Sequence, residues 1–497
     1  MAFDFKDLVI FEMANNHQGS LSHGLNIVSE MAKIAARYNL KAAVKLQYRD
    51  LDTFIHPDYV SRKDVKHIPR FMDTRLKWDE FGTLISSIKD QGMLSMVTPF
   101  DEPSVDVALN HGVDIMKIAS CSCMDWPLLD VVASTGKPII CSTGGCRLSD
   151  VDKIVSFFEH RHVLDLGLLH CVGLYPTLDK DQQLQFMRRM MMRYPFCSVG
   201  YSGHEAPSNL NVVLAAVAMG AKMLERHVGV PTEHVKLNNY SMSPAETEKW
   251  VEGILAARVL CGADGAEKQV TAEEVASLRS LQRGVYMKRD LEKDQPVTKN
   301  DIFYAMPCLE GQTTSGEFLD GMLASQAYHR LEPLKEVRPH DPIRGMRSIV
   351  HEAKGILREA RIAFGNEYAV ELSHHYGLEQ FRRFGAIIVD FINREYCKKL
   401  IVMLPGQQHP MHLHKVKEET FQVLYGDMEL VIDGEARTMR PGDMQLVRRG
   451  QNHAFSTRTG LVFEEISTTH IKGDSFYEDE KIAGKDPAQR KTVLDSF

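Results

Sequence analysis

The stretch LVIFEMANNH, residues 8–17, is a short apolar, β-branched run that ends in polar residues. A longer segment with helical periodicity follows it, and this pair of patterns recurs over about the first 230 residues. The eight apolar runs are residues 8–14, 42–48, 94–100, 115–120, 138–143, 166–172, 198–204 and 223–228. Runs this continuously apolar are buried on both faces, as in parallel sheets covered by helices. The pattern therefore predicts an α/β fold, a (β/α)8 TIM barrel.

Each of these runs ends in polar side chains, and barrel active sites form at the carboxyl ends of the strands. The polar ends are Glu12, Asn16, His17, Lys45, Gln47, Thr98, Asp101, Lys117, Ser120, Ser142, Thr143, His170, Tyr175, Ser202, His204, Glu225 and His227. Any one of them can be a residue that satisfies a loop carbonyl. Because all eight ends are polar, we expect one mixed-charge active site at the barrel mouth.

Two kinds of chemistry stand out within this set. His204 and His227 end adjacent strands, which suits a divalent metal that also binds substrate oxygen and water; the alternative is two loop-contacting histidines. Lys45 and Lys117 lie near a set of hydroxyls and fit a phosphate or carboxylate; the alternative is a Schiff-base lysine. The hydroxyl residues are Thr98, Ser120 and Ser202.

A second motif lies between residues 405 and 453. His412 and His414 are two apart on an expected strand and so point to one face, and neighbouring strands can add Glu419 and His453. Three imidazole nitrogens and one carboxylate suit Zn, Mn, Fe or Ni with open coordination positions. The alternative is the same fold without a metal.

Composition sets the class of protein. The chain has 497 residues, of which 44% are hydrophobic and 25% are charged, so we expect a folded protein with several domains. A net charge of -7 provides no overall field for a nucleic acid. The nine cysteines show no paired framework, and we find neither a secretion signal nor an apolar stretch of about 18 residues. These features predict a cytoplasmic protein with reduced thiols that neither binds nucleic acid nor spans a membrane.

Changes in composition predict the domain boundaries. We expect the barrel over residues 1–265 and a small β-rich module over 272–309, which has too few strands to form a self-sufficient core. Residues 310–345 are rich in Gly, Pro and charge, which predicts a linker. Residues 346–480 predict a helical extension followed by a small antiparallel β-barrel.

Residues 8–305 resemble the sialic acid synthase family, which condenses phosphoenolpyruvate with an open-chain sugar aldehyde. The resemblance rests on motifs that follow the family's order: FEMANNHQG (11–19), KLQ (45–47), TPFD (98–101), KIAS (117–120), STGG (142–145), LHC (169–171) with YPT (175–177), GYSGH (200–204) and ERH (225–227). Residues 272–309 resemble the antifreeze-like (SAF) module that ends these synthases and covers a partner's barrel mouth. The resemblance therefore also implies a homodimer.

The same resemblance assigns roles to the residues at the strand ends. Phosphoenolpyruvate would be held by Lys45, Thr98, Lys117, Ser120 and Ser202. His204 and His227 would hold Mn²⁺ or Mg²⁺. Glu12, Gln47 and Tyr175 would contact the sugar and, with Lys117, form the catalytic set. The product would be a nonulosonic or related 3-deoxy-ulosonic acid, with phosphate released.

Two departures from the family concern the substrate. Gly173 stands where an Asn is usual, and the acidic residue expected before Ser241 is absent from residues 236–241. We therefore expect that the acceptor sugar differs from N-acetylmannosamine or that condensation is altered. A Schiff-base aldolase acting on a keto acid and a non-catalytic sugar-binding protein are the alternative functions.

Residues 385–470 resemble the cupin family. The spacing from Gly406 through His412, His414 and Glu419 to Gly426 matches its first motif, while the second motif keeps His453 but departs at Arg448 and Thr457. The resemblance implies a domain that binds or isomerises a sugar. Acid/base groups for an isomerase could come from Glu371, His374, His375, Tyr376, Lys415 and Lys417, although a solvated polar loop is the favoured interpretation for these residues.

Overall fold

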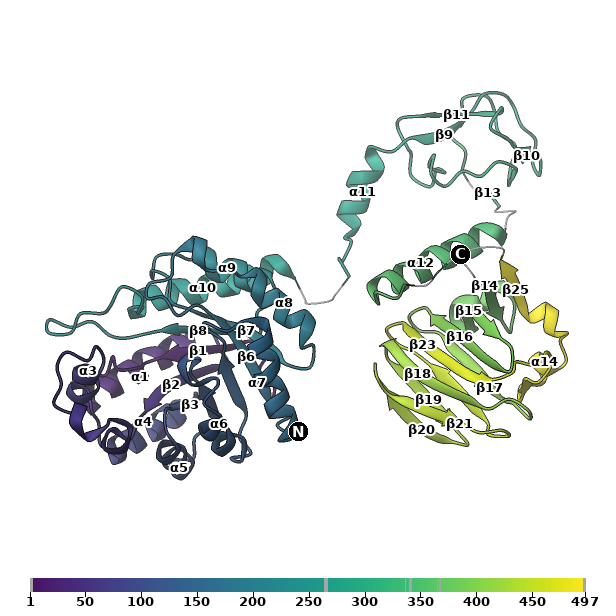
Figure 1. Ribbon diagram of the computed structural model, residues 1–497. Coiled ribbons are helices and arrows are strands. Elements are labelled where there is room, and N and C mark those ends of the chain that lie inside the picture. The colour runs from purple at the N-terminus through teal and green to yellow at the C-terminus, as the bar shows by residue number, and fades with distance from the viewer. Residues whose placement is uncertain are drawn as a thin grey trace. The chain divides into compact units, whose positions relative to one another are not determined.

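The computed structural model describes residues 3–262, 267–335, 337–338, 342–363, 365 and 368–494 (Figure 1). The chain divides into two compact units, Met1–Lys268 and Gln269–Phe497. Among the described residues, no helix is long and apolar enough to cross a membrane.

The first unit is a closed barrel of eight parallel strands, which confirms the predicted fold. The strands are β1 (Leu8–Glu12), β2 (Ala42–Tyr48), β3 (Leu94–Pro99), β4 (Ile115–Ile118), β5 (Ile139–Ser142), β6 (Leu166–Cys171), β7 (Ser198–Gly203) and β8 (Met223–His227). Each lies within one of the apolar runs. The barrel closes where β1 pairs with β8, and there Glu12 is opposite His227 on one side and Lys45 on the other.

Helices surround the barrel strands in Figure 1. They are α1 (Leu21–Arg37), α2 (Leu51–Phe54), α3 (Ile68–Asp73), α4 (Trp78–Asp90), α5 (Glu102–Asn110), α6 (Trp126–Ala133), α7 (Leu148–His160), α8 (Gln185–Arg193), α9 (Asn211–Ala218) and α10 (Pro244–Cys261). Alternate residues of each strand face these helices; Val9 and Phe11, for example, pack in one core with Ile27 and Val28 of α1.

The other strand face fills the barrel interior and sets the position of the active site. Leu8, Ile10, Ala43, Met96, Ile115, Ile140, Leu169 and Met223 form a separate core there. Because side chains alternate along a strand, the next inward-facing position beyond each of these lies toward the mouth. Those next positions include Glu12, Lys45, Thr98, Lys117, Ser142 and Glu225. Polar residues at these positions therefore converge on one point.

The second unit begins with a small module. Its elements are α11 (Ala272–Ser280), β9 (Gly284–Met287), β10 (Pro296–Val297), β11 (Ile302–Ala305), β12 (Met322–Ala324) and β13 (Val337–Arg338). Strand β9 pairs with β11, and β12 pairs with both β10 and β13.

The expected linker at 310–345 is folded over much of its length. Phe318, Met322, Tyr328 and Leu334 are buried in one core with Val285. Composition obscured these apolar residues because they are scattered among Gly, Pro and charged positions. Residues 336 and 339–341 of that segment lie outside the described residues.

The rest of the second unit is an antiparallel β-sandwich, which confirms the predicted cupin domain. A seven-stranded sheet has the order β21-β18-β23-β16-β15-β14-β25, and a five-stranded sheet has the order β20-β19-β22-β17-β24. The strands are β14 (Ala369–His374), β15 (Gly385–Asn393), β16 (Tyr396–Met403), β17 (Gln408–Leu413), β18 (Glu419–Gly426), β19 (Met428–Ile432), β20 (Glu435–Met439), β21 (Met444–Val447), β22 (His453–Ser456), β23 (Leu461–Thr468), β24 (Phe476–Tyr477) and β25 (Lys491–Leu494). Short helices α13 (Phe381–Phe384) and α14 (Glu480–Ala483) connect some of them.

Two apolar cores stabilise this domain. Phe421 and Phe463 of one sheet pack with Leu430 and Phe455 of the other. Helix α12 (Pro342–Glu359) contributes Ile349, Ala353 and Leu357 to the second core, with residues of β14, β15 and β16. The domain also extends beyond the expected end at residue 480, because β25 pairs with β14.

Candidate active sites at the barrel mouth and in the cupin

Two lysines and two carboxylates form a buried cluster at the barrel mouth. Lys45 Nζ lies 2.6 Å from Glu12 Oε2 and 2.8 Å from Glu225 Oε1. Lys117 Nζ lies 4.0 Å from Glu225 Oε2 and donates a hydrogen bond of 2.6 Å to Ser142 Oγ. The four charged side chains are at most 6% exposed. Glu225 thus lies between the two ammonium groups and fixes their positions.

The environment shifts the pKa values of this cluster. Burial lowers the pKa of Lys45 to about 8, although Glu225 opposes the shift. Burial alone would raise the pKa of Glu225, but the Lys117 and Lys45 ammonium groups lower it to about 2. Glu225 is therefore ionised at neutral pH, and Lys45 loses its proton more readily than an ordinary lysine.

The hydroxyls predicted for phosphoenolpyruvate lie around these lysines. Ser202 Oγ donates to Glu225 Oε1 at 2.9 Å. Thr98 is buried on β3, and its Oγ1 has no hydrogen-bond partner among the described residues. Ser120 Oγ accepts a hydrogen bond of 3.0 Å from the Gly144 amide. A buried hydroxyl without a partner is costly, so Thr98 is the strongest indication that a ligand belongs here.

The residues expected to contact the sugar lie on one side of the mouth or above it. Gln47 Nε2 donates to Glu12 Oε1 at 3.0 Å, and Arg49 donates to Gln47 Oε1 at 3.0 Å. Tyr175 lies in the loop after β6 and is 55% exposed, with its ring centroid 4.2 Å from that of His204. Glu12 and Gln47 are therefore hydrogen-bonded to each other, whereas Tyr175 contacts His204.

His204 and His227 are adjacent, as predicted, with ring centroids 5.3 Å apart. The Nδ1 atom of His204 lies 3.0 Å from the Val172 carbonyl oxygen, which suits an Nδ1–H donor and leaves Nε2 free. Burial lowers the pKa of His204 to about 4 and that of His227 well below its usual value. Neutral imidazoles are metal ligands, so this pair fits a divalent ion completed by substrate or water. In the described part of the chain, no third His, Cys, Asp or Glu joins them in a close donor cluster.

Two residues of this site, Glu225 and Tyr240, have no role that the sequence predicts. Glu225 was only one of the polar strand ends, although its position two residues before His227 places both on one face of β8. Tyr240, in the segment after β8, packs its ring 5.1 Å from that of His227. No local pattern marked Tyr240, because the loop fold brings it to the mouth.

The two departures from the family have different structural settings. Gly173 has no atom within 4 Å of the position that a Cβ would take, so the space for a side chain is open there. Ser241 is buried, and its hydroxyl accepts a hydrogen bond of 3.1 Å from Asn16 Nδ2. Ser241 therefore anchors the loop that follows β1.

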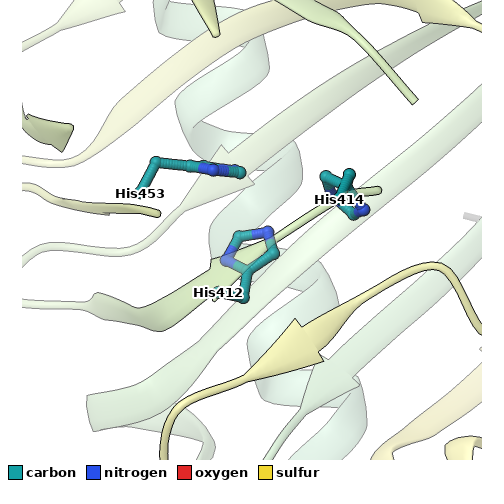
Figure 2. Close-up of side chains that lie close together, drawn as sticks. All are labelled: His412, His414 and His453. Carbon is teal, nitrogen blue, oxygen red and sulfur yellow. The ribbon is translucent and has the colours of Figure 1, made fainter. Parts of the chain in front are cut away.

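The second site lies inside the cupin. His412 on β17, His414 just after it and His453 on β22 place one nitrogen each within 4.8 Å of the others (Figure 2). Each Nδ1 atom lies against a backbone carbonyl oxygen: that of Pro410 for His412 at 3.1 Å, that of Asp474 for His414 at 2.6 Å and that of Gln451 for His453 at 3.1 Å. This arrangement orients the rings and keeps the three Nε2 atoms clear of the backbone carbonyls, as in metal sites.

Glu419, the predicted fourth ligand, lies beside the triad and also has a cationic neighbour. Its Oε1 lies 3.3 Å from His414 Nε2, and its Oε2 lies 3.2 Å from His453 Nε2. Lys417 forms ion pairs with both Glu419 and Glu465, the latter at 2.9 Å. Burial would raise the pKa of Glu419, but Lys417 and the histidines hold it well below its usual value. The donor set of three imidazoles and an ionised carboxylate fits a divalent metal.

A pocket of about 120 Å³ adjoins the triad. Of the acid/base candidates, Glu371, His375 and Lys417 line it. The others have different partners: His374 bonds to Thr492, Tyr376 to Asp479, and Lys415 lies exposed over the ring of Phe476. The structure therefore brings half of that expected set to the site. It adds His409, Lys399, Glu465, Tyr477 and Arg490, which sequence spacing did not indicate.

Comparisons with known proteins agree with both domains. Residues 31–266 match the NeuB family, and residues 399–464 match the cupin domain. An N,N'-diacetyllegionaminic acid synthase from Legionella pneumophila is 28% identical over 316 residues, which cover 60% of this chain and 85% of that protein. An N-acetylneuraminate-9-phosphate synthase from Drosophila melanogaster is 29% identical over 230 residues, which cover 44% of this chain and 59% of that protein.

A solved structure extends the similarity beyond the barrel. The crystal structure of a Chromobacterium violaceum protein, described as a spore coat polysaccharide biosynthesis protein E, is 40% identical with a TM-score of 0.65. The match covers 67% of this chain and 100% of that one. The chain is therefore a sialic acid synthase-like enzyme of the NeuB family that carries a C-terminal cupin domain.

Proposed function

We propose that the barrel condenses phosphoenolpyruvate with the aldehyde of an open-chain aldose. The products are a nonulosonic or related 3-deoxy-ulosonic acid and inorganic phosphate. The observation that carries this proposal is the convergence of two buried lysines and two neutral histidines at one barrel mouth. The names of the related synthases support the same reaction class.

The anionic substrate belongs beside the lysines. Lys45 and Lys117 supply two ammonium groups in a water-poor site, where charge-assisted hydrogen bonds to phosphate and carboxylate are strong. Thr98, Ser120 and Ser202 supply hydroxyls around them, and Thr98 Oγ1 gains the partner that it lacks. Glu225 keeps both lysines in place while the substrate enters.

The sugar belongs between the lysines and the histidines. Glu12 and Gln47, which hydrogen-bond to each other, and Tyr175 above His204 orient its hydroxyls. The enol carbon of phosphoenolpyruvate then attacks the aldehyde carbon, water adds to the resulting cationic carbon, and phosphate leaves. A divalent ion, Mn²⁺ or Mg²⁺, held by His204 and His227 supplies polarisation of the aldehyde oxygen when it is bound.

The cupin holds a second divalent ion in this proposal. His412, His414, Glu419 and His453 are its ligands, and Zn, Mn, Fe or Ni suits such a set. The domain binds or isomerises a sugar in the adjoining pocket. The module at 269–335 covers the mouth of a partner's barrel in a homodimer, and the enzyme acts in the cytoplasm.

Phosphate release from phosphoenolpyruvate tests the barrel reaction directly. The full chain is assayed with a panel of aldoses, with and without Mn²⁺, and we expect release that depends on the aldose and is lost with EDTA. The lowered pKa of Lys45 favours a Schiff-base aldolase as the second candidate. That enzyme would be trapped by borohydride with a keto acid and would ignore EDTA, whereas a non-catalytic sugar-binding protein would release no phosphate.

A further inference from the structure

We propose that the cupin pocket binds a sugar acid through its carboxylate and discriminates against neutral aldoses. The pocket has an excess of positive charge, and two of its lining cations, Arg490 and Lys472, have no carboxylate partner among the described residues. That the ligand is the barrel's own product rests on the proposed function, because the product of that reaction is an ulosonic acid. The preference for an acid rests on the pocket alone.

The first support is the balance of charge. Five cations line the pocket, namely Lys399, Lys417, Lys472, Arg490 and Lys491. Three carboxylates line it, namely Glu371, Glu419 and Glu465. A neutral sugar needs hydrogen-bonding groups of both kinds but no such excess, whereas a carboxylate is attracted by it.

The second support is how the ions pair. Lys491 forms an ion pair of 2.6 Å with Glu371, and Lys417 forms ion pairs with both Glu419 and Glu465. Lys399 lies 3.3 Å from Asp390, a residue that does not belong to the pocket lining. Every carboxylate in the lining is therefore engaged. Across the described residues, no carboxylate pairs with Arg490 or Lys472, so these two cations remain for a ligand.

The third support is the position of Arg490. Its guanidinium carbon lies 5.0 Å from the centroid of the Tyr477 ring. That ring stacks on His412 of the triad, with centroids 5.3 Å apart and planes at 20°. Arg490 and the triad histidine His412 thus both lie against the same aromatic ring. A guanidinium in the pocket lining presents a planar pair of donors that matches a carboxylate.

A buried atom without a partner also points to a ligand. His375 lines the pocket and is 2% exposed. Its Nε2 lies 3.1 Å from His409 Nε2, but its Nδ1 has no hydrogen-bond partner among the described residues. A ligand oxygen in the pocket would remove the cost of that unmade hydrogen bond.

The size of the pocket fits one end of a long molecule. About 120 Å³ accommodates a carboxylate and the neighbouring carbons, which is less than the usual volume of about 300 Å³ or more for a whole ligand. Lys472 and Gly473 on the rim are exposed, so the rest of the ligand extends into solvent. An ulosonic acid, with its carboxylate at one end of a hydroxylated chain, has this shape.

Calorimetric titration of the full chain tests the proposal. The chain carries Lys117→Met, which weakens anion binding at the barrel, and is loaded with Zn²⁺. The probes are N-acetylneuraminate and 3-deoxy-octulosonate as sugar acids and N-acetylmannosamine as the neutral aldose. We expect at least one acid to bind about tenfold or more tightly than the aldose, and Arg490→Gln to weaken that binding about tenfold. Lys472→Gln should weaken it less, because Lys472 is exposed.

A matched control is Arg437→Gln, which removes an exposed arginine of β20 outside the pocket lining and should leave the affinity unchanged. Equal or tighter binding of the aldose, no binding of any probe, or unchanged affinity in Arg490→Gln with normal zinc content would overturn the proposal. Phosphate release by the chain with Lys117 intact is measured in parallel. If the chain releases phosphate but binds no sugar acid, only this inference is wrong. If it binds a sugar acid but releases no phosphate, only the proposed barrel reaction is wrong.

Discussion

The barrel mouth and the cupin pocket both place histidines beside buried ion pairs of lysine and glutamate, but they orient the histidines differently. In the cupin, a backbone carbonyl holds Nδ1 of all three triad histidines. At the barrel mouth, His204 has such a carbonyl, and His227 is held by packing against His204 and Tyr240.

This difference follows from where the residues lie. The cupin histidines are on or beside paired strands inside a sandwich, where register fixes them before any ligand arrives. The barrel histidines end their strands and pack against the rings of Tyr175 and Tyr240, and of the two only His204 has a backbone carbonyl against its Nδ1 in the described structure. We therefore expect the cupin to bind its metal more tightly, since less ordering accompanies binding.

The largest effect is expected at the barrel histidines. His204→Ala or His227→Ala should lower kcat/KM for phosphate release by about 10³-fold or more, because Lewis-acid stabilisation supplies several kcal/mol. Neither should shift the melting temperature strongly, since strand-end residues lie outside the packed layers. His160→Ala, an exposed histidine of α7, is the control. Activity near the original value in both variants would remove the metal role.

The next effect concerns the cupin metal. His412→Ala should weaken divalent-ion binding by the second unit by about 10²-fold or more, because the remaining three ligands lose affinity and geometry. Bound metal is measured after dialysis against a competing chelator, with His351→Ala on α12 as the exposed control. If the barrel retained its ion longer than the intact cupin, the proposed difference in preorganisation would be wrong.

Lys117→Met should act on one substrate. It deletes a charged donor to an anion, so the KM for phosphoenolpyruvate should rise about 10-fold to 100-fold while the KM for the sugar changes little. The control is Lys153→Met, which makes the same substitution on the exposed face of α7, away from the barrel mouth. An unchanged KM for phosphoenolpyruvate would contradict the anion-binding role.

The pH profile probes Lys45. Because burial lowers its pKa to about 8, the ammonium form that attracts the anion is present below that pH and lost above it. We expect kcat/KM for phosphoenolpyruvate to fall above about pH 8, approaching about tenfold per pH unit. Phosphate release at low phosphoenolpyruvate concentration measures this. Lys45→Arg, which stays charged, should remove the fall, and a fall that persists there would assign it to another group.

The smallest effect is expected from removing the cupin. Among the described residues, the barrel core and the module core end at Leu334, and the cupin has cores of its own. A chain of residues 1–340 should therefore release phosphate within about twofold of the full chain. If it is folded and dimeric but inactive, the cupin contributes to the condensation site, and the two sites are not independent.

Alternation along single strands made much of the barrel site predictable. Inward positions such as Lys45 and Lys117 follow from the period of two, and all eight strands lie within runs that the sequence indicates. The spacing of His412, His414, Glu419 and His453 likewise predicted a donor set that the sandwich brings together. The apolar residues of 310–335 do not recur at the spacing of a helix or a strand. The core that they form in the module was therefore not predictable from the sequence.

Local patterns in the sequence determined the two folds, the mouth residues and the histidine triad, because each depends on periodicity or on short spacing within one or two strands. Tertiary structure alone determined which charges meet. Glu225 bridges Lys45 and Lys117 through the closure of the barrel, and Lys417 pairs with Glu465, which lies 48 positions further along the chain. Such pairings depend on three-dimensional distances between residues far apart in the chain, and the strength of a charge interaction depends on that distance and on burial.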